Sequence, residues 1–114
     1  MQAITPAQLD QWLALHAATD ASPPIVLDVR EPWELQTASV NPQGFELVSI
    51  PMRSVPERLN ELDPERPIAC LCHHGMRSAQ VTHFLLNQGF AKVVNIHGGI
   101  DAWSRERDPS VPLY

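Results

Sequence analysis

The chain has 114 residues, of which 44% are apolar and 18% charged, and its formal charge at pH 7 is −5. This length and composition predict one soluble globular domain over residues 1–114, with enough apolar sequence to form a core. The acidic balance argues against nucleic acid or an acidic membrane surface as a partner, whereas a small anion can still bind where local donors attract it.

The apolar patterns predict helices and strands in alternation. In chain order, the predicted elements are a helix over 6–17, a strand over 25–29, a short helix over 31–38, a strand over 46–50, a helix over 54–62, a strand over 67–71, a helix over 78–88, a strand over 93–96 and a final helix after Gly98 and Gly99. Capping boxes at Thr5–Gln8 and Ser54–Glu57 mark two of the helix starts. Trp12, Trp33 and Trp103 each fit a helix face that packs on the sheet.

Strands that alternate with helices through short connections predict a parallel sheet with helices on both faces. In such sheets, ligands bind beyond the carboxyl ends of the strands, often where a helix N-terminus points at them. The stretch CHHGMRS (72–78) lies at such a place, because the strand over 67–71 precedes it and the helix over 78–88 follows it.

Cys72 is the candidate nucleophile of this stretch. Cysteine attacks as the thiolate, and the start of a helix favours that form. Gly75 permits a positive φ, so that neighbouring N–H groups can turn inward. Arg77 adds a fixed positive charge, which we expect to attract an anionic substrate and to help hold the thiolate. Ser78 is expected either to cap the helix or to donate a hydrogen bond to the sulfur.

The neighbouring cysteine and histidines have plainer interpretations. An isolated cysteine is most often a small core residue, and this fits Cys70, which lies on the strand itself. His73 and His74 are expected to face solvent or the mouth of the pocket, and a general-base role is the weaker interpretation because adjacent residues rarely both face one site. A metal site that also used Cys72 and His97 would lack the ligand spacing of structural zinc, so we expect neither metal nor cofactor.

A disulfide between Cys70 and Cys72 would be badly strained, because the two residues are only two positions apart. Free thiols indicate a reducing compartment. The N-terminus lacks the basic segment and apolar core of a signal peptide, and no apolar run is long enough to span a membrane. We therefore expect a cytoplasmic protein with no membrane partner.

Taken together, these motifs resemble the rhodanese family of sulfurtransferases. CHHGMRS is preceded by VLDVREPWE (26–34) and followed by VVNIHGGIDAW (93–103), and the match runs from ITPAQL to DAW, over most of the chain. The resemblance implies an α/β fold, a three-layer α/β/α domain with a five-stranded parallel sheet, in which residues 2–4 add an edge strand.

The resemblance also implies a reaction. Cys72 would carry a persulfide, in a loop completed by His73, His74, Gly75, Met76 and Arg77. The protein would then be a thiosulfate sulfurtransferase. It would move a sulfane sulfur from thiosulfate, or a related small anionic donor, to cyanide or to a thiol, including the thiol of a protein.

Two features on the other strands qualify the resemblance. Asp28 and Arg30 match the family's strand-end pair, and an aspartate in an apolar strand needs partners, so we expect this pair to brace the loop. The segment SVNPQGFELVSIPM (39–52) departs from the family's usual His-Ile-Pro-Gly-Ala-like sequence. That side of the pocket is therefore not carried over from the family.

Two other functions remain as alternatives. Cysteine-dependent phosphatases use a Cys-x5-Arg loop, whereas Cys72 and Arg77 form Cys-x4-Arg. A loop one residue shorter suits a single sulfur better than three phosphate oxygens. A sulfur-carrier or regulatory module without turnover is the second alternative, and the presence of both Cys72 and Arg77 argues against it.

Overall fold

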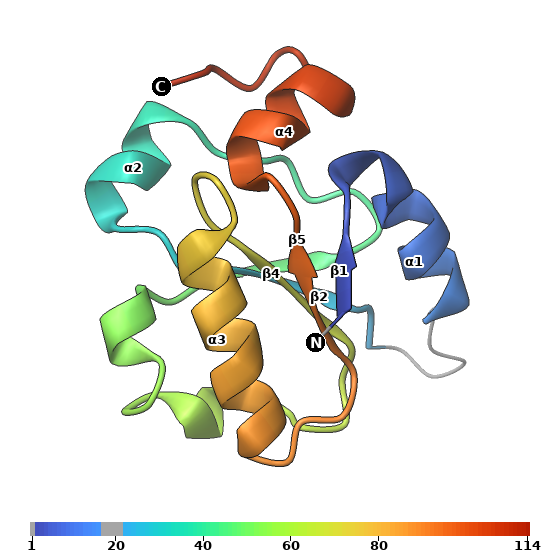
Figure 1. Ribbon diagram of the computed structural model, residues 1–114, viewed down its shortest axis with the longest axis vertical. Helices are drawn as coiled ribbons and strands as arrows, with labels where there is room; N and C mark the ends of the chain where they lie inside the picture. Colours follow the sequence, from blue (N-terminus) through green and yellow to red (C-terminus); the bar gives the residue numbers. More distant parts are fainter. Residues whose placement is uncertain (1, 17–21) are drawn as a thin grey trace.

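A parallel sheet of five strands organises the computed structural model, which describes residues 2–16 and 22–114 (Figure 1). The strands are β1 (Gln2–Ile4), β2 (Ile25–Asp28), β3 (Glu46–Ser49), β4 (Ile68–Leu71) and β5 (Val93–Ile96), in the spatial order β1-β5-β4-β2-β3. Every neighbouring pair is parallel. The five predicted strands, including the edge strand at residues 2–4, are confirmed to within one residue at each end.

In the described residues, three helices and three 3-10 turns lie between the strands, and a fourth helix follows the last strand. They are η1 (Pro6–Gln8), α1 (Leu9–Leu15), α2 (Pro32–Thr37), η2 (Met52–Ser54), η3 (Leu59–Glu61), α3 (Met76–Asn87) and α4 (Gly99–Glu106). The helix predicted over 6–17 is thus a 3-10 turn followed by α1, and its last residue, Ala17, lies outside the described residues, as do residues 18–21. In the part of the chain that the structure describes, no helix has the length and apolar character needed to cross a bilayer.

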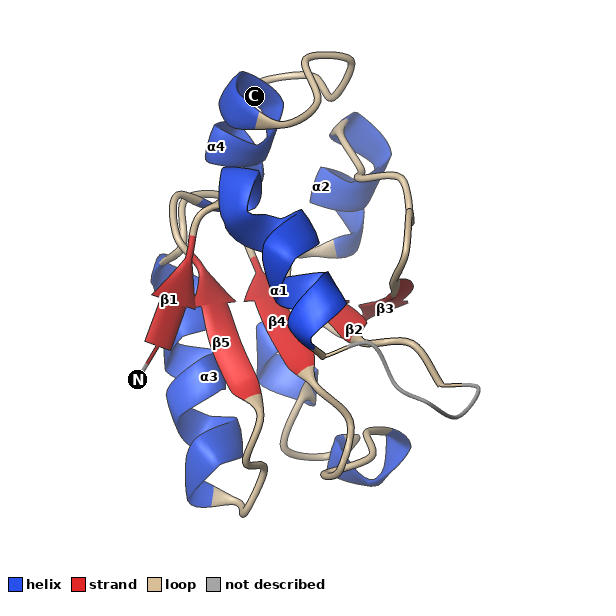
Figure 2. Ribbon diagram, turned by 90° about the vertical axis from the view of Figure 1, so that its right-hand side faces the viewer, coloured by secondary structure: helices blue, strands red, loops and turns tan. Residues whose placement is uncertain are grey.

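The sheet separates two apolar clusters, which confirms the expected three layers. Alternate residues of β4 face opposite sides: Ile68 and Cys70 belong to the cluster beneath α3, whereas Ala69 and Leu71 belong to the cluster beneath α1 and α4. Figure 2 shows α1 and α4 in front of the sheet and α3 behind it. Cys72 continues the alternation and faces the same side as Cys70.

Two expectations were wrong. The helix predicted over 54–62 is instead two separate 3-10 turns, η2 and η3. So short a segment does not offset the cost of helix nucleation. Trp33 is 63% exposed rather than packed on the sheet, whereas Trp12 and Trp103 are buried.

The helix predicted over 78–88 begins two residues earlier, at Met76. Gly75 occupies the N-cap position with φ of 103°, a conformation that a residue with a Cβ rarely adopts. The chain can therefore turn from the end of β4 into α3 within four residues. This tight turn places the loop after β4 directly against the first turn of the helix.

Candidate active site

The sulfur of Cys72 lies just beyond the carboxyl end of β4, and the residue is 1% exposed. Two donors approach it from the start of α3. The backbone N–H of Gly75 donates to Sγ at 3.1 Å, and Ser78 Oγ lies 3.2 Å from the same atom. Ser78 is buried in the first turn of α3 and does not occupy its N-cap position, so the predicted hydrogen bond to sulfur is found and the predicted cap is not.

The N-terminus of α4 holds the backbone of the Cys72 loop from the other side. The N–H of Ile100 donates to the carbonyl of Cys72 at 2.8 Å, and the N–H of Asp101 donates to the carbonyl of His73 at 3.1 Å. In a trans peptide the N–H points opposite to the C=O. The N–H groups of His73 and His74 therefore point away from α4, as an anion-binding loop requires.

Gly99 makes this close approach possible. It has φ of 60°, and a Cβ at this position would collide with the carbonyl oxygens of Cys72 and His73. The predicted turn at Gly98 and Gly99 is therefore also the surface on which the loop rests. Helix α4 therefore forms part of the site, although it follows the loop by some 25 residues. The sequence pattern does not indicate this contact.

Asn95 ties the loop to the sheet. It is buried on β5, and its Nδ2 donates to the carbonyl of Gly75 at 3.1 Å. Its Oδ1 lies 2.5 Å from Ser78 Oγ. Cys72, Ser78 and Asn95 thus form one connected polar network within an apolar core.

Arg77 does not extend freely into the site. Its guanidinium donates two hydrogen bonds to the carboxylate of Glu34, at 2.6 and 2.9 Å. Glu34 is 3% exposed, and its pKa is lowered to about 2, chiefly because of the hydrogen bonds from Arg77. The hydroxyl of Tyr114 donates a further hydrogen bond to Glu34 at 2.6 Å. Glu34 therefore already balances the charge of Arg77. This pairing counts against the expected role of Arg77 in attracting an anion.

Asp28 and Arg30 form a buried pair in which both guanidinium edges are used. Arg30 Nε and Nη2 donate to the Asp28 carboxylate at 2.9 and 2.8 Å. Arg30 also donates to the carbonyl of Ala38 and to the hydroxyl of Tyr114. The pair therefore braces the end of α2 and the C-terminal segment directly, and it is linked to the loop through Tyr114 and Glu34.

The two loop histidines lie at the rim of the site. His73 is partly buried, with its ring stacked against Tyr114 and its Nε2 donating to the Tyr114 backbone oxygen at 2.8 Å. His74 is exposed and stacks on the other face of His73. Met76 is 77% exposed beside them, so these residues form the outer surface of the loop.

Cys70 is buried two residues before Cys72, on β4. Burial raises the pKa of its thiol to about 12, so this residue stays a neutral core side chain at neutral pH. Both cysteines are free. Within residues 2–16 and 22–114, no three His, Cys, Asp or Glu side chains gather as they would around a metal ion.

This fold and loop can be compared with those of known proteins. Residues 6–106 match the rhodanese-like domain family. The chain belongs to that family. Similar solved structures include the crystal structure of a rhodanese-related protein from Thermoplasma volcanium. Its sequence is 32% identical, the match covers all of both chains, and the two structures superimpose with a TM-score of 0.78.

Two relatives by sequence extend this comparison. A protein named sulfurtransferase from Allochromatium vinosum is 34% identical over 91% of this chain and 94% of its own length. The chloroplastic rhodanese-like/PpiC domain-containing protein 12 of Arabidopsis thaliana is 43% identical over 78% of this chain, which spans 30% of that longer protein. The family to which this chain belongs thus includes proteins named sulfurtransferases.

Three residues of this rhodanese-like site were not predicted: Glu34, Asn95 and Tyr114. Asn95 gave a usable signal, because a polar residue in the apolar run VVNI needs buried partners just as Asp28 does. Glu34 and Tyr114 gave none, since each contacts residues far away in the sequence. The site therefore contains one polar group that the strand pattern could have revealed and two that it could not.

Proposed function

We propose that this protein transfers a sulfane sulfur from thiosulfate, or a related anionic donor, to cyanide or a thiol through a persulfide on Cys72. The observation that supports this most is the pair of donors aimed at one buried sulfur, from the Gly75 N–H and the Ser78 hydroxyl. Two such donors favour an anionic sulfur over a neutral thiol. They suit the thiolate before transfer and the persulfide after it.

The reaction has two balanced steps. The Cys72 thiolate attacks the outer sulfur of thiosulfate, the S–S bond of the donor breaks, and sulfite leaves with the electron pair. Cyanide then attacks the terminal sulfur of the persulfide, thiocyanate leaves, and the thiolate is restored. Neither step needs a proton, a metal or a redox cofactor. A cycle that returns to a free thiolate fits a reducing compartment, so we place the protein in the cytoplasm.

The contacts of Arg77 weigh against the phosphatase alternative. A phosphatase of this type uses its loop arginine to hold the phosphate oxygens, but one N–H of each terminal guanidinium nitrogen of Arg77 already donates to the buried carboxylate of Glu34. Releasing Arg77 would leave a buried carboxylate without its partner, which is costly. This cost favours transfer of a single sulfur over binding of a phosphate group by Arg77.

The first prediction tests the nucleophile. Cys72→Ser should abolish sulfur transfer from thiosulfate to cyanide and leave the fold intact, because a hydroxyl cannot form a persulfide. Mass spectrometry of the parent protein treated with thiosulfate should show the mass of one added sulfur, which a thiol reductant removes. Peptide mapping should place that sulfur on Cys72.

Cys70→Ala is the matched control and should keep most of the activity. An inactive Cys70 variant beside an active Cys72 variant would show that the nucleophile is assigned to the wrong residue. A stable persulfide that cyanide and thiols do not discharge would favour the sulfur-carrier alternative instead.

A further inference from the structure

Tyr114 is linked to both ends of the catalytic loop, although it lies outside it. Its ring stacks on the ring of His73, with the centroids 3.9 Å apart and the planes 5° from parallel. The backbone oxygen of Tyr114 accepts a hydrogen bond from His73 Nε2 at 2.8 Å. Its hydroxyl donates to the carboxylate of Glu34 at 2.6 Å, and the same carboxylate holds the guanidinium of Arg77. The loop runs from Cys72 to Arg77, so Tyr114 is linked to its second and its last residue.

The carboxylate of Glu34 accepts hydrogen bonds from three directions. Arg77 donates two, the hydroxyl of Tyr114 donates one, and the backbone N–H of Glu31 donates one at 3.1 Å. Burial raises the pKa of Tyr114 to about 12, so its hydroxyl keeps its proton at neutral pH and remains a donor. Arg30 Nη1 donates to the same hydroxyl oxygen at 3.0 Å, which directs the O–H bond toward Glu34. The carboxylate and the guanidinium that it holds therefore cannot shift without loss of the contact with Tyr114.

The backbone of the loop has supports of its own. The N-terminus of α4 holds the carbonyls of Cys72 and His73, and Asn95 on β5 holds the carbonyl of Gly75. These contacts fix neither the imidazole of His73 nor the guanidinium of Arg77. Backbone contacts from α4 and β5 and side-chain contacts from the C-terminal segment thus hold the loop at different points.

We propose that Tyr114 is a positioning residue for sulfur transfer: it holds the catalytic loop in the shape that binds the sulfur, at its start through His73 and at its end through Glu34. The ring and the hydroxyl have separate tasks, because the ring restrains the start of the loop and the hydroxyl restrains its end. Tyr114 acts through these residues rather than on the sulfur itself. This inference rests on the proposed sulfur transfer and adds a residue that lies outside the loop sequence.

The direction of the loop N–H groups explains why such a restraint affects the reaction. The N–H of Gly75 donates to Cys72 Sγ, and the N–H groups of His73 and His74 point away from α4. Preorganised donors of this kind stabilise a developing anion only when they are aimed at it. A misplacement of about 1 Å, caused far from the reacting atoms, is enough to lower a rate about 100-fold. A loop whose two ends move independently would lose this alignment, even though its thiol is unchanged.

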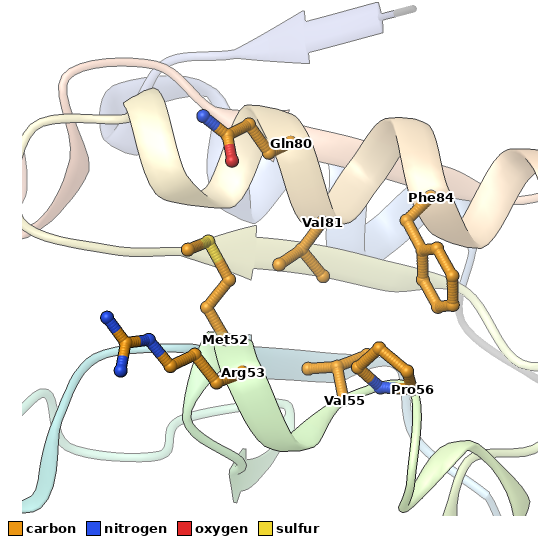
Figure 3. A pocket seen from close by; sticks show the side chains of 7 residues that line it. All are labelled: Met52, Arg53, Val55, Pro56, Gln80, Val81 and Phe84. Atoms are coloured by element: carbon orange, nitrogen blue, oxygen red, sulfur yellow. The ribbon is translucent and has the colours of Figure 1, made fainter.

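Steady-state kinetics with thiosulfate and cyanide test this role. Tyr114→Leu removes the ring and the hydroxyl, and it should lower kcat/KM about 10- to 100-fold, mainly through kcat. Tyr114→Phe keeps the ring on His73 and should lower kcat/KM only about 3- to 5-fold, because only the end of the loop is released. Phe84→Leu is the matched control: Phe84 is also a partly buried aromatic residue, but it lines an apolar groove two turns along α3 (Figure 3). It should lose stability and keep kcat/KM.

A double-mutant cycle distinguishes positioning from a general loss of stability, with all rates measured well below the unfolding temperature of each variant. Tyr114→Phe should change kcat/KM much less in the Glu34→Ala background than in the parent, because the carboxylate that the hydroxyl orients is absent. Equal factors in the two backgrounds would overturn the proposal, as would full kcat/KM in Tyr114→Leu. A loss of kcat/KM in Phe84→Leu as large as that in Tyr114→Leu would overturn it too, since the loss would then follow from any missing ring.

A measurement that needs no turnover separates this proposal from the proposed function. Nitrogen-15 relaxation of the substrate-free protein reports the backbone order of residues 73–77. This order should fall in Tyr114→Leu, fall less in Tyr114→Phe and stay at the parent value in Phe84→Leu, which would support the positioning role even if no donor gave turnover. Parent-like order of the loop in Tyr114→Leu would overturn it, whatever the activity of that variant. Tyr114→Phe, which keeps the packing of the ring, provides the same tests if Tyr114→Leu does not fold.

Discussion

The hydroxyl group of Ser78 has one proton and two neighbouring acceptors, Cys72 Sγ and Asn95 Oδ1. Asn95 cannot turn its amide round, because its Nδ2 donates to the carbonyl of Gly75. Its oxygen therefore always faces Ser78. With a neutral thiol, Ser78 can donate to Asn95 and accept from sulfur, whereas with a thiolate it can donate to sulfur only by leaving Asn95. The sulfur and the amide thus compete for a single proton.

The second prediction follows from this competition. Ser78→Ala should lower kcat/KM for sulfur transfer about 10-fold, because the anionic sulfur keeps only the Gly75 N–H as a donor from this side. It should also cost about 1 kcal/mol of the free energy of unfolding, since Asn95 Oδ1 loses its partner. Steady-state kinetics and urea unfolding of the same preparations measure the two effects.

Ser104→Ala provides the control for Ser78→Ala. Ser104 is also a buried serine, but it donates to the carbonyl of Val111 at 2.6 Å on α4, within a different set of contacts. It should lose a similar amount of stability and keep its kcat/KM. Equal activity losses in the two variants would mean that Ser78 acts only through stability and has no special relation to the sulfur.

At the scale of the elements, the site is a contact between the loop after β4 and the start of α4. The first turn of α4 leaves N–H groups free of helical partners, and two of them hold the carbonyls of Cys72 and His73. These hydrogen bonds satisfy buried carbonyls and fix the direction in which the loop N–H groups point. The glycine at the start of α4 is thus a packing requirement of the active-site loop.

The third prediction concerns this contact. Gly99→Ala should destabilise the protein by about 2 to 3 kcal/mol and lower sulfur transfer markedly, because the added Cβ would displace the Cys72 and His73 carbonyls. Gly89→Ala is the control, since Gly89 also has a positive φ, of 94°, but no atom within 4 Å of the added Cβ. It should cost about 1 kcal/mol and leave kcat unchanged. Retention of full activity by the Gly99 variant would contradict the packing argument.

The element predictions failed where local patterns were the only guide. The capping box at Ser54 is present in the sequence, yet the segment is too short for an α-helix and forms only η2 and η3. Trp33 fits an amphipathic pattern, but α2 ends after six residues and its tryptophan meets Tyr114 edge to face instead of the sheet. The strands β2, β4 and β5 were predictable because a parallel strand that is buried on both faces is a nearly continuous apolar run.

At the scale of the whole molecule, a chain of polar contacts joins the first half of the sequence to its end. It passes from Asp28 through Arg30 and Tyr114 to Glu34 and Arg77. Tyr114 is 80 residues from Glu34, and Arg77 is 43 residues from it. A single sequence contains no periodicity that links such positions, which is why the loop was predictable and its supports were not.

The fourth prediction is the acid stability of the protein. The pKa of Glu34 is lowered to about 2 in the folded chain, chiefly by Arg77, whereas an unfolded chain has the ordinary value near 4.5. The resulting stabilisation is complete above about pH 4.5 and is lost as the pH falls from there to about 2. Glu34→Gln should therefore be less stable than the parent at pH 7 and should lose less stability on acidification.

Urea unfolding at a series of pH values between 2 and 7 measures this effect. Glu61→Gln is the control, because Glu61 also pairs with an arginine and has a lowered pKa, but the pair lies on the surface. Glu61→Gln should change the pH dependence of the free energy of unfolding much less than Glu34→Gln does. Parallel curves for the parent and the Glu34 variant would show that the Arg77–Glu34 pair does not couple protonation to folding.

The dependence of the Cys72 loop on α4 also sets an order of events during biosynthesis. The loop leaves the ribosome well before Asn95, Ile100 and Asp101, so its carbonyls and the Gly75 peptide have no partners while β4 and α3 form. Until the last strand and helix dock, the Cys72 loop lacks the hydrogen bonds that orient its N–H groups. Selective reactivity at residue 72 is then a property that the polypeptide acquires in the final stage of its folding.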